Sequence, residues 1–168
     1  MRSYKKSENE KINANNQLPF YSAVPKKDCQ FFTEILRSNG YYCTNNSKED
    51  YNMLMSPLAW DESNITAHWR NRKENKPFFA VFNFSTTHES KLWKNEIKLT
   101  KNEINSIQLP SVFPENYMIK KDFLTNYKNI ELLDKKIGEI IQQLKEDGLY
   151  DNTIIFFYSD HGGPFPRY

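Results

Sequence analysis

The chain contains 168 residues, enough for one domain with a hydrophobic core. Its 23 Lys and Arg residues nearly balance its 21 Asp and Glu residues, so a formal net charge of +2 gives no reason to expect nucleic acid as a partner. The apolar runs at residues 78–84 and 154–158 are far shorter than the roughly 20 residues that a membrane helix requires, so we expect no membrane span.

The first third of the chain predicts little regular structure. Residues 1–24 are polar and rich in Asn and Lys, and we expect them to form an extended, poorly anchored segment. Asp28 fits the N-cap of a short helix that Gly40 would end, because apolar residues recur between them at helical spacing. Residues 41–44 are a candidate strand.

The middle of the chain contains one strong strand signal. Residues 45–76 are loop-like, with one short helix possible at residues 65–71. Residues 78–84 are apolar on both faces, as a central parallel strand would be. Residues 89–116 contain two prolines and predict a long connection.

The C-terminal third predicts a long helix and a final strand. Apolar residues recur every three or four positions from about residue 119 to residue 147, and Gly148 fits the end of such a helix. Residues 154–158 are again apolar on both faces and predict a buried strand. Strand, helix and strand in this order favour an α/β/α sandwich with a mostly parallel sheet.

Three polar residues follow the two predicted buried strands. His88 comes four residues after residues 78–84, and Asp160 and His161 come shortly after residues 154–158. Ligands bind at the carboxyl ends of parallel strands, so these side chains are expected to face one crevice. An Asp oxygen and a His nitrogen can bind a divalent cation, but such a site needs further donors. The alternative is a turn that carries His161 on the surface.

Other potentially reactive residues give weaker signals. His88 could donate to an anionic substrate oxygen or act as a general acid, or it could be an ordinary loop histidine. His68 is expected to be structural or on the surface. Cys29 and Cys43 do not form a C-x-x-C pair and are either unused thiols or a disulfide. The sequence contains neither a G-x-S-x-G motif nor a Gly-rich phosphate loop.

Several of these segments together resemble the sulfatases of the alkaline phosphatase superfamily. Residues 77–83 and 87–90 are similar to their central strand and histidine loop, and residues 148–162 to their metal-binding strand end. Residues 40–48 and 60–62 resemble a bacterial branch related to heparan N-sulfatase. The resemblance implies an α/β/α sandwich and the hydrolysis of sulfate esters or sulfamates, with a sulfated small molecule or glycan as substrate.

The resemblance also assigns roles to individual residues. Asp160 and His161 match the later pair of ligands of a Ca²⁺ ion, whose two earlier Asp ligands have no counterpart in this chain. His88 matches the histidine that contacts the sulfate. Lys48 corresponds to the first active-site lysine, although the family continues Lys-x-His where this chain has Asp50. The formylglycine nucleophile arises from a C/S-x-P-x-R motif, which this sequence lacks.

We therefore expect residues 1–168 to be part of a sulfatase catalytic domain, a central fragment that is inactive alone. The first thirty residues hold no signal peptide, but a periplasmic or secreted location is expected for the full-length enzyme. One alternative is a phosphate mono- or diesterase of the same superfamily. The other is a non-catalytic remnant that binds sulfated glycans through His88, Lys48 and Arg167.

Overall fold

A computed structural model describes most of the chain in two compact units. The described residues are 23–26, 28–49, 51, 53–73, 75–93 and 97–166. Residues 1–83 form the first unit and residues 84–168 the second. The segment expected to be extended, residues 1–24, lies outside the described residues up to residue 22.

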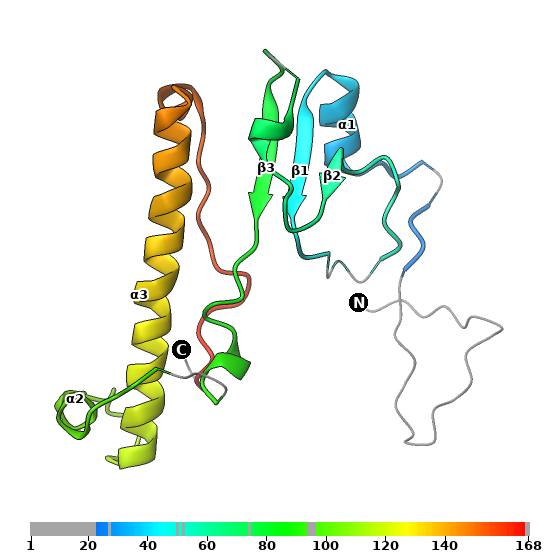
Figure 1. Cartoon of the computed structure of the whole chain (residues 1–168). Coiled ribbons are helices and arrows are strands. Elements are labelled where there is room, and N and C mark those ends of the chain that lie inside the picture. The colour runs from blue at the N-terminus through cyan, green and yellow to red at the C-terminus, as the bar shows by residue number, and fades with distance from the viewer. Residues whose placement is uncertain are drawn as a thin grey trace. The chain divides into compact units, whose positions relative to one another are not determined.

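The first unit contains a three-stranded parallel sheet (Figure 1). Its strands, in the order β2-β1-β3, are β1 (Tyr42–Asn46), β2 (Glu62–Ser63) and β3 (Phe78–Phe82). Thr44 of β1 aligns with Glu62 on one side and with Ala80 on the other. An open parallel sheet with helices agrees with the expected incomplete α/β fold.

The strand at the centre of this sheet is β1 and not β3. Residues 78–84 were expected to form a central strand, and β3 does pair in parallel, but it is an edge strand of the described sheet. Burial follows the pairing, because Cys43, Thr44 and Asn45 of β1 are almost inaccessible to solvent. Every residue of β3 is only half-buried.

Helix α1 (Phe32–Ser38) confirms the first predicted helix but begins later than expected. Its N-cap is Phe31 and not Asp28. The Glu34 carboxylate accepts the Phe31 N–H at 3.0 Å, which satisfies a backbone donor at the start of the helix without an upstream side chain. Gly40 has a φ of +88°, as expected for the residue that ends a helix.

Aromatic side chains pack against strand β3. The 3₁₀ helix η1 (Trp69–Asn71) carries the buried Trp69, whose ring lies 5.8 Å from Phe78 and 5.6 Å from Phe82. The short helix expected over residues 65–71 is therefore present only as its last turn. This turn places a large ring over the strand and buries it.

The second unit is organised around the 30-residue helix α3 (Tyr117–Glu146), which confirms the predicted long helix. The Asn116 side chain accepts the Met118 N–H at 2.8 Å at its start, and Gly148 has a φ of +67° after its end. Short helices flank it: η2 (Glu89–Lys91), α2 (Lys101–Ser106) and η3 (Tyr150–Asn152). The predicted connection over residues 89–116 thus contains a helix, which Thr100 and Glu103 cap reciprocally.

Phe123 forms the centre of the core in the second unit. Its side chain is fully buried, and its ring stacks on Phe165 with centroids 4.1 Å apart. Phe113 lies edge-on at 5.0 Å. Ile104 of α2 and Leu144 of α3 are also buried. No helix in the described part of the chain is long and apolar enough to cross a membrane.

The predicted strand over residues 154–158 does not form, which corrects the expectation from the sequence. The residues of this segment are 47–83% exposed, and the segment pairs with no strand among the described residues. The backbone at Thr153 is extended, with φ −126° and ψ 129°. A run that is apolar on both faces becomes a buried strand only where neighbouring strands supply hydrogen bonds on both sides. The apolar composition of residues 154–158 predicted a strand, but composition does not specify which strands would pair with it.

We predict that Gly138→Ala stabilises the chain by about 0.5–1 kcal/mol. Gly138 lies within α3, and no atom lies within 4 Å of an added Cβ. Gly148→Ala is the matched control, because its surroundings are equally open but its φ is +67°, so it should destabilise by about 1 kcal/mol. Urea unfolding of both variants measures the two changes. A destabilising Gly138→Ala would contradict the described helix.

We also predict that the two cysteines differ sharply in reactivity. Both are free; Cys29 is exposed and Cys43 is buried. Burial, followed by the charge of Asp61, raises the pKa of the Cys43 thiol to about 11. The thiolate is the reactive form, so at pH 8 Cys43 should react with an aromatic disulfide reagent more than about 100-fold more slowly than Cys29. Cys29→Ser should remove the rapid phase, and equal rates for both thiols would refute the described burial.

Candidate functional site

Lys48 lies in the loop that follows the central strand, at the carboxyl end of the sheet. Its side chain is exposed, while its backbone is held from within the unit. The Asn45 side chain donates from Nδ2 to the Lys48 carbonyl oxygen at 3.1 Å. The next residue, Glu49, accepts a hydrogen bond from the Ser63 hydroxyl through its carboxylate. The loop that carries Lys48 is therefore connected to both β1 and β2. Asp50, at the position where the family has a histidine, lies outside the described residues.

Asparagines occupy the end of β1 and the position directly after β3, and none of them was among the site residues expected from the sequence. Asn45 is fully buried, and its Oδ1 accepts from Asn83 Nδ2 at 2.9 Å. Asn46 donates from Nδ2 to the carbonyl oxygens of Ile65 and Ala67. The available signal was the abrupt change from apolar residues to asparagine at the end of each strand.

His88 has a defined tautomer when it is neutral. Its Nδ1 accepts the backbone N–H of Ser90 at 3.1 Å, so this nitrogen carries no proton. The Ser90 hydroxyl lies 2.9 Å from the same nitrogen. The proton of the neutral ring must then reside on Nε2, and the exposed side chain offers a single N–H donor. Such a donor suits an anionic oxygen.

The loop before His88 is attached to the long helix of its own unit. Thr86 is 8% exposed, and its hydroxyl accepts a hydrogen bond from Lys136 Nζ of α3 at 3.0 Å. The His88 N–H donates to the Ser85 carbonyl oxygen at 3.2 Å. Both bonds limit the movement of the backbone from which the imidazole projects.

His68 has the same local hydrogen bond as His88 but different surroundings. Its Nδ1 accepts the Arg70 N–H at 3.1 Å. Its ring, however, packs 4.0 Å from Trp69 and 5.5 Å from Phe82, measured between ring centroids. This packing agrees with the structural role expected from the sequence.

Asp160 and His161 lie in a glycine-containing turn. The Ser159 hydroxyl accepts the Gly162 N–H at 3.0 Å, and Gly162 has a φ of +91°. The side chains are 72% and 77% exposed, with Asp160 Oδ2 and His161 Nε2 3.8 Å apart. The turn leaves both donors accessible to a ligand.

Asp160 and His161 are suitable types of ligand for a divalent cation, but two ligands are too few for a complete site. A carboxylate oxygen and an imidazole nitrogen are suitable ligands. Among the described residues, however, no three His, Cys, Asp or Glu side chains are grouped so that they could hold a metal ion. Further ligands would have to complete the site.

The structure does not join His88 to the Asp160–His161 turn. No hydrogen bond or ion pair links them among the described residues. The strand expected to carry Asp160 and His161 to a crevice shared with His88 is absent, as described above. Their convergence, like the roles of Lys48 and of the metal ligands, therefore stays a prediction.

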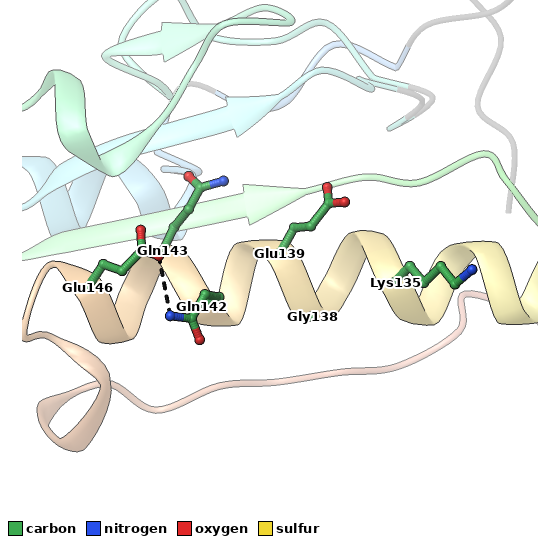
Figure 2. A pocket seen from close by; sticks show the side chains of 6 residues that line it. All are labelled: Lys135, Gly138, Glu139, Gln142, Gln143 and Glu146. Atoms are coloured by element: carbon green, nitrogen blue, oxygen red, sulfur yellow. Dashed lines mark hydrogen bonds between the residues drawn. The ribbon is translucent and has the colours of Figure 1, made fainter.

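A hollow of about 650 Å³ along α3 contains none of the predicted site residues (Figure 2). Its lining comes from one helix and consists of Lys135, Gly138, Glu139, Gln142, Gln143 and Glu146. Gln142 donates to the Glu146 carboxylate at 3.2 Å. The mixed charges and open form of this surface give no argument for a substrate site.

Comparison with known proteins identifies the family of the chain. The family model described as Sulfatase matches residues 29–167. An ulvan-active sulfatase of Formosa agariphila is 42% identical over 185 aligned positions, which cover 89% of this chain and 31% of the relative. A second ulvan-active sulfatase of that organism is 30% identical over 124 positions, covering 73% of this chain and 24% of the relative.

A human relative agrees with the branch expected from the sequence. The human N-sulphoglucosamine sulphohydrolase is 28% identical over 60 positions, which cover 36% of this chain and 12% of the enzyme. No solved structure is detectably similar to the chain. The chain spans about a third or less of the length of these relatives. Because the family model covers most of the sequence, the chain belongs to the sulfatase family.

Proposed function

We propose that this chain contributes part of the catalytic site of an enzyme that hydrolyses sulfate esters or sulfamates. The observation that carries the proposal is His88, which lies within the segment matched by the sulfatase family and offers an Nε2–H donor fixed by Ser90. A sulfate group presents several anionic oxygens, and a preoriented donor stabilises the charge that develops on them.

Each predicted residue has a role in this proposal. His88 donates to a sulfate oxygen or protonates the leaving group. Lys48 places a positive charge near the sulfate, on a loop connected to β1 and β2. Asp160 and His161 supply two ligands of a divalent cation, proposed to be Ca²⁺, together with ligands from other segments. The bound cation would neutralise charge on the sulfate oxygens.

The nucleophile in this proposal is a formylglycine located outside the 168 residues. The sequence has no C/S-x-P-x-R motif. Neither cysteine is a convincing substitute: Cys43 is buried with a raised pKa, and Cys29 has no such motif around it. This chain would therefore orient and stabilise the substrate but would not attack the sulfur.

A sulfated sugar is the substrate class that we propose. Two of the relatives are named for ulvan and the third for N-sulphoglucosamine. The sulfate group of such a sugar is an anion, which suits the positive charge of Lys48 and the Nε2–H donor of His88.

We predict that the purified chain alone does not hydrolyse an aryl sulfate, because removing a nucleophile costs many orders of magnitude in rate. The positive counterpart is a chimera of the Formosa agariphila enzyme that is 42% identical, with its aligned segment replaced by this chain. The chimera should release sulfate from an aryl sulfate or from ulvan. Turnover by the chain alone would contradict the assignment of the nucleophile. A chimera that hydrolyses only phosphate esters would favour a phosphatase, and one that binds sulfated glycan without turnover would favour a binding role.

We predict that His88→Gln lowers kcat of this chimera about 100-fold or more, because a positioned acid typically contributes 10² to 10⁴. His68→Gln is the control, since His68 has the same Nδ1 hydrogen bond but packs on Trp69. The control should change kcat by less than about threefold, apart from any loss of folded protein, which thermal unfolding measures. If both folded variants lost kcat equally, the result would contradict the proposed role of His88 in the site.

A further inference from the structure

Asn45 is a fully buried polar side chain at the end of the central strand. A buried amide is costly unless its donors and acceptor are all paired. The Asn45 amide meets this condition. Its Oδ1 accepts from Asn83, and its Nδ2 donates to the Lys48 carbonyl oxygen at 3.1 Å and to Ser63 Oγ at 3.0 Å.

The hydrogen bonds around Asn45 run in one consistent direction. Asn83 Nδ2 donates to Asn45 Oδ1, which leaves Asn45 Nδ2 as the atom that faces the loop. Ser63 accepts from Asn45 with its hydroxyl oxygen and uses its own proton to donate to the Glu49 carboxylate. These hydrogen bonds therefore link the residue after β3 to β1, and they link β1 to residue 48 directly and to residue 49 through β2.

We propose that Asn45 is a positioning residue that fixes the Lys48–Glu49 backbone at the carboxyl end of the sheet. This inference rests on the proposed function, in which Lys48 places its positive charge near the sulfate. A lysine has a long, flexible side chain, so the position of its charge depends on how firmly its backbone is held. The Asn45 amide holds that backbone directly at the Lys48 carbonyl oxygen and indirectly through Ser63 and Glu49.

Asn46 provides a matched comparison within the same strand. Successive side chains of a strand point to opposite faces, so the Asn46 side chain forms hydrogen bonds with different partners from those of Asn45. Its Nδ2 donates to the carbonyl oxygens of Ile65 at 2.9 Å and Ala67 at 3.3 Å. A substitution at Asn46 should therefore disturb a different loop.

The experiment compares Asn45→Asp with Asn46→Asp in the full chain. Each substitution removes the Nδ2 donors with almost no change in size. Trypsin cleavage after Lys48 reports on the order of the loop, and the ¹³C resonance of the Lys48 carbonyl reports on its hydrogen bond. We expect Asn45→Asp to accelerate cleavage after Lys48 about tenfold and to shift the carbonyl resonance, since a buried hydrogen bond is lost. Asn46→Asp should leave both signals close to wild type.

Inorganic sulfate then tests the function on which the inference rests. Sulfate should shift the side-chain resonances of Lys48 in the wild-type chain, and Asn45→Asp should weaken that response several-fold. If sulfate does not shift the Lys48 side-chain resonances of the wild-type chain, the assumed role of Lys48 is overturned. If Lys48 of Asn45→Asp responds like wild type, the positioning role is overturned while the role of Lys48 stands.

Ser63→Ala keeps the inference testable if Asn45→Asp does not fold. Ser63 is exposed, and its replacement removes one partner of Asn45 together with the bond to Glu49. Cleavage after Lys48 should then rise about threefold, less than for Asn45→Asp because the direct bond from Asn45 remains. Unchanged cleavage in Ser63→Ala, or equal acceleration in Asn46→Asp, would overturn the proposal.

Discussion

The pairing of β1 with a parallel strand on each side is the constraint on which the first unit depends. It removes Cys43, Thr44 and Asn45 from solvent and places the carboxyl ends of three strands at one edge. A polar residue at such an end must find partners within the protein. Asn45 finds them in Asn83, Ser63 and the Lys48 backbone, so one buried amide links the sheet to the following loop.

In the second unit, a helix holds the loop that precedes a predicted site residue. The N-terminal half of α3 buries Phe123 among aromatic rings, and farther along Lys136 donates to Thr86 in the loop before His88. Ser90 then determines which nitrogen of the His88 ring carries the proton. Packing sets the position of the loop, and a local backbone hydrogen bond sets the chemistry of the side chain.

The sequence predicted those features that a local pattern determines. The period of the apolar residues identified α3, and the two-sided apolar run identified β3 as a parallel strand. The same kind of run failed at residues 154–158, because apolar composition does not specify which strands would pair with it. Asn45 was missed for the opposite reason: asparagine at a strand end reads as the start of a loop, and its burial depends on β2 and β3, which lie far away in sequence. The position of His88, Asp160 and His161 after apolar runs marked them as candidate site residues, whereas Lys48 and the specific role of each residue came from the resemblance to a family.

Two of the predicted site residues, Lys48 and His88, lie in segments that hydrogen bonds hold within their own unit. The backbone carbonyl of Lys48 accepts a hydrogen bond from the Asn45 side chain, and the His88 ring accepts one from the Ser90 N–H. Electrostatic stabilisation is effective when donors are fixed before the reaction begins, because they need no reorganisation as charge develops. Asp160 and His161 differ, since two exposed donors cannot complete a cation site alone. In the proposed enzyme, this chain would therefore supply preoriented contacts to the sulfate, whereas the metal site and the nucleophile would require additional segments.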